Sequence, residues 1–171
     1  MTTLRIPNRR QRPNGFTLME LLIVISIMLI LMLIAIPNFN KIKMTANENS
    51  AIKSLQVIGT AEQQYSSSFP ANGYSCTLPA LGGDPSKGNP TPTLAELIPD
   101  SLAAGVKDGY QFTISNCSKQ TVGSTDNITG YTVTATPLAV GKTGNRGFCT
   151  DQFNQIKYDP AGGTNCTQSM Q

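Results

Sequence analysis

A long apolar segment near the amino terminus constrains this chain more than any other feature. Leu21 to Ile36 is a run of sixteen residues in which only Ser26 is polar. Extended to Phe16 and Pro37, the segment has 22 residues, which as an α-helix would span roughly 33 Å. That length is enough to cross the hydrocarbon core of a bilayer. The sequence therefore predicts a transmembrane helix over residues 16–37.

The charges ahead of this segment predict its orientation. The first fifteen residues contain no acidic residue and four arginines, namely Arg5, Arg9, Arg10 and Arg12. An excess of positive charge holds a flanking segment in the cytoplasm. The amino terminus is thus expected in the cytoplasm, and everything after Lys41 on the other side of the membrane.

The cysteines agree with this orientation, because all four lie in the part expected outside the cytoplasm, where disulfides persist. Four cysteines allow three pairings. We favour Cys149 with Cys166 and Cys76 with Cys117, since the first pair closes a short carboxy-terminal loop and would stabilise it by about 3 kcal/mol. Free thiols and the other pairings stay open at this point.

The order of segments around Gly15 differs from that of a secretory signal, in which small residues follow the apolar region. Here Gly15 precedes it, so a cut after Gly15 would leave the apolar segment on the mature protein. The stretch "GFTLMELLIVI", followed by "AIPNF", resembles the amino terminus of bacterial type IV pilins and type II secretion pseudopilins. The residues that carry the resemblance are Gly15, Phe16, Thr17, Leu18, Met19, Glu20 and Pro37.

The resemblance implies a processing step, an assembly and a location. A membrane-embedded prepilin peptidase would cut between Gly15 and Phe16 and N-methylate the new amine of Phe16. The implied partners are identical or homologous pilin subunits, this peptidase, the inner-membrane assembly machinery and, before assembly, membrane lipid. The implied location is the inner membrane of a Gram-negative-type envelope, with the globular domain in the periplasm, and then an extracellular filament.

Glu20 is an acidic residue inside the apolar segment. Ionisable groups in membrane helices cost ~2 to 4 kcal/mol on insertion scales and usually have a partner. Glu20 could instead lie at the membrane interface and reach the headgroups. The resemblance implies that its partner is the methylated Phe16 amine of a neighbouring subunit, an ion pair that would fix the register of subunits because a mis-stacked one leaves both charges unpaired.

Pro37 removes a backbone donor and clashes with the preceding helical turn, so we expect a kink there; a helix stop at the membrane surface is the alternative. Helical spacing of apolar residues resumes afterwards and predicts an amphipathic continuation over residues 38–65. Its expected domain-facing residues are Ile42, Ala51, Leu55, Ile58 and Tyr65.

Residues 66–108 are rich in Pro and Gly and are expected to form a loop between the helix and a sheet. Alternating patterns predict strands in "GYQFTIS", 109–115, and "GYTVTAT", 130–136, with weaker candidates at 147–150 and 155–159. Residues 109–171 would then form an antiparallel sheet with a disulfide-closed end. The expected fold is α+β, a long amino-terminal helix packed on three or four antiparallel strands. The resemblance to type IV pilins implies the same layout.

Several kinds of chemistry are not expected from this sequence. The chain has no histidine, which excludes histidine-based catalytic triads and histidine-containing zinc sites. We see no catalytic constellation, metal motif or cofactor motif, so we expect neither an enzyme nor a cofactor. The basic residues of the exported part are scattered singly, and nucleic-acid binding by this subunit alone is not expected.

Three functions remain open from the sequence. The first is a structural subunit of a type IV pilus, serving adhesion, motility or related surface functions. The second is a pseudopilin of a type II secretion system, which acts in the periplasm. The third is a monomeric domain held by an uncleaved anchor. The cysteines near the carboxy end favour the pilin, as does the lack of a calcium-binding tail.

Overall fold

The computed structural model describes residues 15–84, 86, 88–122 and 125–170, without the side chains of residues 34–38, 122 and 125. It confirms the expected α+β class. A 51-residue helix comes first, followed by two short helices and a sheet. The elements are α1 (Leu18–Ser68), α2 (Leu78–Leu81), α3 (Asp100–Ala103), β1 (Val106–Lys107), β2 (Tyr110–Val122), β3 (Thr125–Pro137), β4 (Gly147–Asp151), β5 (Lys157–Asp159) and β6 (Gln168–Ser169).

The chain divides into two compact units, with the boundary between Phe39 and Asn40. In the first unit, every large apolar side chain from Leu18 to Leu33 is exposed, by 45% to 83%. Within the described ranges, no helix combines the length and the apolar character that a membrane crossing requires. The expected span, 16–37, includes residues 34–38, whose side chains are outside the description, and the expected kink at Pro37 falls among them.

The second unit contains a six-stranded antiparallel sheet in the order β1-β2-β3-β4-β5-β6, in which each strand pairs with its sequence neighbour. The expected three or four strands were too few. The added strands β1 and β6 have two residues each, which is too short for an alternating pattern to reveal. The two expected main strands are longer than predicted, with 13 residues each in β2 and β3.

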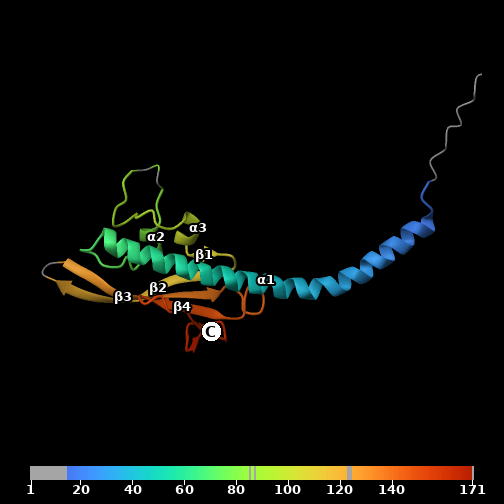
Figure 1. The fold of residues 1–171 in the computed structure, drawn as a ribbon. Helices are drawn as coiled ribbons and strands as arrows, with labels where there is room; N and C mark the ends of the chain where they lie inside the picture. Colours follow the sequence, from blue (N-terminus) through green and yellow to red (C-terminus); the bar gives the residue numbers. More distant parts are fainter. Residues whose placement is uncertain (1–14, 85, 87, 123–124, 171) are drawn as a thin grey trace, which may run out of the picture. The chain divides into compact units, whose positions relative to one another are not determined.

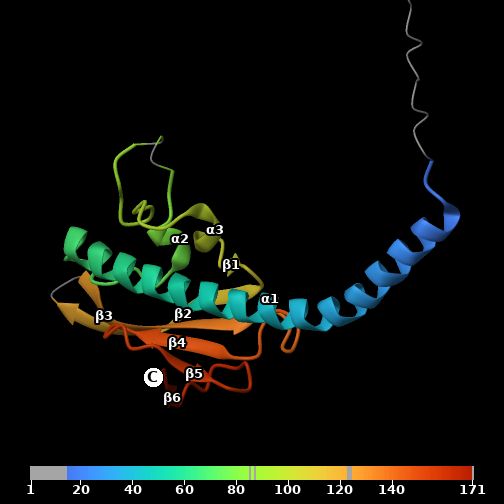
Figure 2. The ribbon, with the colours of Figure 1, turned by 45° about the vertical axis from the view of Figure 1, so that its right-hand side comes forward.

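The helix covers one face of this sheet, as Figures 1 and 2 show. Alternate residues of the strands face it, among them Tyr110, Tyr131 and Val133, which are fully or almost fully buried. From α1 the buried partners are Ala51, Leu55, Ile58, Ala61 and Tyr65. Helical spacing therefore identified this stripe correctly from Ala51 onward.

Ile42 departs from the expected stripe, because its side chain is 65% exposed. The reason is that the domain meets α1 one turn before Ala51 through a polar residue, Glu48, which is buried. Apolar spacing extrapolated back from Ala51 assumes an apolar contact where the fold uses a carboxylate. Ile42 is thus a surface residue of the helix.

Two disulfides tie the second unit together. Cys76, after the end of α1, pairs with Cys117 of β2 at a Cα–Cα distance of 6.1 Å. Cys149 of β4 pairs with Cys166, shortly before β6, at a Cα–Cα distance of 6.0 Å. These are the two pairs that the sequence favours. The second bond connects the segment just before β6 to β4, the strand that pairs with β3.

We expect the double substitution Cys149→Ser with Cys166→Ser to lower the free energy of unfolding by about 3 kcal/mol, because it frees a loop of 17 residues in the unfolded chain. The measurement is urea unfolding of the detergent-solubilised protein, followed by circular dichroism. A peptide map of the unreduced wild type is the control, and it should contain only the two cross-links described above. Cross-links between the two pairs, or a variant as stable as the wild type, would contradict this prediction.

Candidate functional site

Glu20 forms a reciprocal hydrogen-bonded arrangement with Thr17 at the start of α1. The backbone N–H of Thr17 donates to Glu20 Oε2 at 2.9 Å, and Thr17 Oγ1 donates to the same oxygen at 3.0 Å. The backbone N–H of Glu20 donates to Thr17 Oγ1 at 3.2 Å. This is a capping box, in which two side chains satisfy the unpaired donors of a helix amino terminus.

This local role of Glu20 was not predicted, because the prediction for Glu20 rested on its charge alone. The signal was present, because Thr17 and Glu20 stand at the Thr-x-x-Glu spacing of a capping box just before an apolar run. The two bonds that the carboxylate accepts both end on Oε2. Within the described part of the chain, Oε1 accepts no hydrogen bond, so that oxygen can take a donor from another molecule.

The expected cleavage position lies just ahead of the helix. Gly15 and Phe16 precede α1, and the Phe16 side chain is 87% exposed. A Cβ atom added at Gly15 would meet no heavy atom within 4 Å. The bond between these residues is therefore sterically open in the described chain. Cleavage there and methylation of Phe16 stay predictions.

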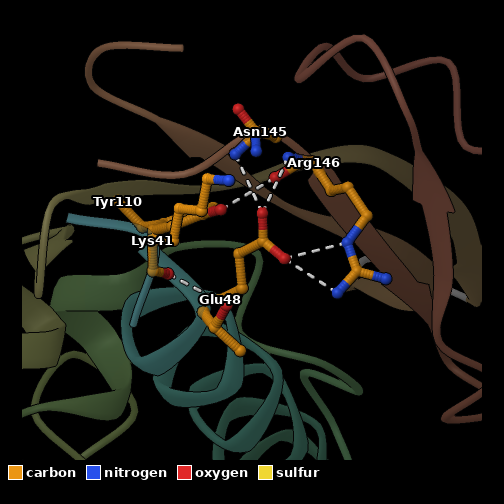
Figure 3. Close-up of polar contacts among 6 residues, drawn as sticks. Lys41, Glu48, Tyr110, Asn145 and Arg146 are labelled. Atoms are coloured by element: carbon orange, nitrogen blue, oxygen red, sulfur yellow. Dashed lines mark hydrogen bonds and ion pairs between the residues drawn. The ribbon is translucent and has the colours of Figure 1, made fainter. Parts of the chain in front are cut away.

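In the second unit, a buried carboxylate on α1 binds the connection between β3 and β4 (Figure 3). Glu48 Oε1 accepts from the backbone N–H groups of Asn145 at 2.8 Å and Arg146 at 3.2 Å. Its Oε2 accepts from Arg146 Nε at 2.9 Å and Nη2 at 2.7 Å. Four donors compensate the desolvation of this carboxylate, which otherwise would make its burial unfavourable.

Aromatic rings surround the arginine of this pair. The Arg146 guanidinium lies over the rings of Phe148, at 5.4 Å, and Tyr158, at 5.3 Å. The Tyr110 hydroxyl donates to the Arg146 carbonyl oxygen at 2.9 Å. Burial, together with the Glu48 charge, raises the pKa of Tyr110, and the Arg146 charge lowers it in part. Tyr110 therefore stays a neutral donor at physiological pH.

A second buried carboxylate, Glu62, holds the segment that follows α1. Its oxygens accept from the backbone N–H of Ser75 at 2.7 Å and from Ser75 Oγ at 2.6 Å. Burial raises the pKa of Glu62, and the bonds from Ser75 oppose that shift. Glu62 was not predicted as a buried residue, although it stands at helical spacing between the buried Ile58 and Tyr65.

Groups suited to metal binding are absent from the described ranges, where no cluster of three or more Cys, Asp or Glu side chains could hold an ion. The two buried carboxylates Glu48 and Glu62 fix α1 to its domain. The candidate site is the amino-terminal segment, where the capping box and the exposed Phe16 lie.

Glu48→Ala should lower the free energy of unfolding by about 3 kcal/mol, because it leaves two backbone donors and the Arg146 guanidinium without their acceptor. Thermal and urea unfolding of the detergent-solubilised protein would measure the loss. Asn49→Ala is the matched control, since Asn49 is the next residue on the same helix, is polar and is exposed. Equal stability of the two variants would show that the Glu48 pair does not hold the helix.

Glu62 should make stability depend on pH with a defined sign. Because its pKa is raised in the folded state, the folded protein binds this proton more tightly than the unfolded chain, and stability falls as pH rises from the ordinary carboxyl range through the folded pKa. Glu62→Gln removes this dependence, so its stability relative to the wild type should rise over the same interval. Urea unfolding in steps between about pH 4 and pH 8 would measure it; a constant difference would refute it.

The control for this pH series is Asp100→Asn, which also replaces a carboxylate by its amide. Asp100 is exposed at the start of α3, so its replacement tests the loss of one acidic group without burial. If Asp100→Asn reproduced the rise seen with Glu62→Gln, burial of Glu62 would not be the cause.

Comparison with known proteins supports the resemblance seen in the amino-terminal residues. Residues 10–36 match the family described as the prokaryotic N-terminal methylation motif. The chain is 36% identical over 86 residues to the type IV major pilin protein PilA of Myxococcus xanthus (strain DK1622), a match that covers 50% of this chain and 38% of that protein. The match thus spans less than half the length of this relative.

No solved structure gives a significant match to the chain. The fold nevertheless has the expected arrangement of a long amino-terminal helix on an antiparallel sheet. The resemblance to the type IV pilin family that residues 15–40 predict is therefore confirmed by the matched motif and by the similarity to a major pilin.

Proposed function

We propose that this protein is a pilin, a structural subunit that assembles with copies of itself into an extracellular type IV pilus. The observation that carries the proposal is the exposed apolar surface from Leu18 to Leu33. Contiguous apolar surfaces of this extent mark sites that bind lipid or other proteins. A segment covered first by lipid and then by identical helices accounts for this surface.

Processing is the first step of the proposed function. Prepilin peptidase cleaves the chain between Gly15 and Phe16 and methylates the Phe16 amine. The matched methylation motif, residues 10–36, includes both positions, and both lie ahead of the first helical residue. The chemistry belongs to the peptidase, so the chain acts as a substrate and needs no catalytic group of its own.

Before assembly, the apolar segment holds the subunit in the inner membrane, with the arginine-rich end in the cytoplasm and residues 40–171 in the periplasm. Both disulfides lie in the second unit, which fits an oxidising compartment. The assembly machinery then extracts the subunit into the filament, where the apolar side chains of neighbouring helices replace lipid.

Glu20 guides this assembly through its charge. One carboxylate oxygen is already committed to the capping box of its own helix. In the proposed filament, the other accepts from the methylated amine of a neighbouring subunit. A subunit in the wrong register would bury an ammonium and a carboxylate without partners, and this penalty selects the correct position.

A type II secretion pseudopilin would share the processing and the helix but would stay in the periplasm. The similarity to a major pilin favours the pilus. Intact mass spectrometry of sheared surface filaments and of membranes separates the two. Subunits that begin at N-methylated Phe16 in the sheared fraction support the pilus, and processed subunits found in membranes alone support the pseudopilin. A chain still carrying residues 1–15 would refute the proposal.

Three variants separate the charge of Glu20 from its capping role. Glu20→Gln keeps a side chain that can complete a capping box but has no charge, Glu20→Ala loses both, and Thr17→Ala keeps the charge without the cap. If the charge directs assembly, both Glu20 variants should yield processed, membrane-held subunits and at least tenfold fewer filaments, roughly the effect of 1.4 kcal/mol. Thr17→Ala should still assemble. The measurement is immunoblotting of sheared and membrane fractions; abundant filaments from Glu20→Gln would overturn the proposed ion pair.

A further inference from the structure

The connection between β3 and β4 contains a rigid turn that displays apolar residues, and we name residues 138–143 the 138–143 loop. Backbone bonds fix its shape, from Leu138 N–H to the Gly109 carbonyl at 2.9 Å and from Thr143 N–H to the Ala139 carbonyl at 2.9 Å. The Ala139 N–H donates to Thr143 Oγ1 at 3.1 Å. Gly141, with φ of 80°, occupies the left-handed position at the tip.

This loop presents two apolar side chains to solvent beside a cation. Leu138 is 56% exposed and Val140 is 58% exposed, and Lys142 is exposed between the tip and Thr143. The hydrogen bonds described above fix the backbone of the loop. The folded structure therefore keeps both side chains exposed. Neither Leu138 nor Val140 belongs to the buried core.

The loop lies beside the first residues of α1 in the second unit. Asn47 Nδ2 donates to the Thr143 carbonyl at 2.8 Å, and Asn40, Gly141 and Lys142 line one surface hollow. Figures 1 and 2 both show the orange connection running alongside α1. The helix adds two exposed lysines here, Lys41 and Lys43. Residues 40–47 and the loop together contain three lysines and no acidic residue.

We propose that the 138–143 loop, with Lys41 and Lys43, binds the anionic headgroups of the bilayer that holds the subunit before assembly. This inference rests on the proposed membrane-held stage. Lysines near an anionic surface are attracted to it, and apolar side chains beside them enter the boundary between headgroups and acyl chains. The three cations and two exposed apolar side chains match both parts of that boundary.

The position in the chain supports the same partner. Lys41 follows Ile36, the last residue of the apolar run, by five residues, which on a helix is about 7.5 Å. The headgroup layer on each side of a bilayer is roughly 5 to 7 Å thick. A bilayer that holds the apolar segment therefore has its surface near Lys41 and the loop packed beside it. The contact would fix how the domain sits on the membrane.

The chain has no tryptophan, so a single introduced indole reports on one position. Three variants of the full chain, Leu138→Trp, Ile25→Trp and Phe153→Trp, are reconstituted in vesicles of equal parts phosphatidylglycerol and brominated phosphatidylcholine. Ile25 reports on the apolar segment. Phe153 is the matched control, because it is 72% exposed and adjoins Asn154, which lies against Gly59 of α1. Gly59 follows Lys41 by 18 residues, about 27 Å along a helix.

The expected result is quenching by bromine, with blue-shifted emission, for the indoles at 138 and 25 and a water-like, unquenched spectrum for the indole at 153. Quenching at 25 without quenching at 138 overturns this inference and leaves the membrane-held stage intact. No quenching at 25 overturns that stage, and the inference fails with it. A blue shift at 138 without quenching indicates a second copy of the chain on the loop, and equal quenching at all three indicates unspecific adsorption; either overturns the inference.

A charge variant tests the electrostatic part separately. Adding Lys142→Gln to Leu138→Trp should reduce the ratio of bound to unbound loop roughly fivefold in anionic vesicles, and raising the salt concentration should act in the same direction. In vesicles of zwitterionic lipid alone, Lys142→Gln should change little. The same change in both vesicle types would overturn the role given to anionic headgroups. Circular dichroism checks that each variant is folded.

Discussion

The structure depends on the packing of α1 against the sheet of the second unit. Only the part of α1 from Asn40 onward belongs to that unit. Residues from Ala51 to Tyr65 give α1 an apolar stripe that fills the core above the sheet. At one end of the stripe, Glu48 binds the β3–β4 connection through four donors. Near the other end, between Ala61 and Tyr65, Glu62 binds the segment that leads to the first disulfide. The helix is thus held by an apolar face together with two buried carboxylates, one just before that face and one near its end.

The two parts of α1 have different roles, because the helix runs through both units of the chain. The first unit exposes its large apolar side chains from Leu18 to Leu33, as the proposed contacts with lipid and with neighbouring subunits require. The second needs a fixed attachment, and buried polar contacts supply it because a carboxylate with directional bonds accepts one register, whereas an apolar stripe tolerates sliding. The positions of Glu48 and Glu62 therefore define where along α1 the domain is attached.

Much of this could be predicted from the sequence, because the strongest signals are local and periodic. The apolar stripe of α1, the main strands around Tyr110 and Tyr131, and the α+β class follow from spacing alone. Strands of two residues, such as β1, depend on tertiary pairing and leave no pattern. The exposure of Ile42 was not predictable from spacing, because a contact between Glu48 and Arg146, 98 residues apart, replaces the apolar stripe there. The capping role of Glu20 was predictable, because Thr17 and Glu20, the two residues of the capping box, lie within one helical turn.

The sheet has a further consequence in the way the domain can form. Every strand pairs with its neighbour in the sequence, so the sheet is built from a succession of hairpins whose closure costs little chain entropy. The long-range step is the packing of α1 on the sheet, in which Glu48 binds Asn145 of the β3–β4 connection across 97 residues of sequence. A chain with this topology can complete its sheet before the amino-terminal helix, which is synthesised first, packs on it. The order of synthesis and the order of folding are thereby uncoupled.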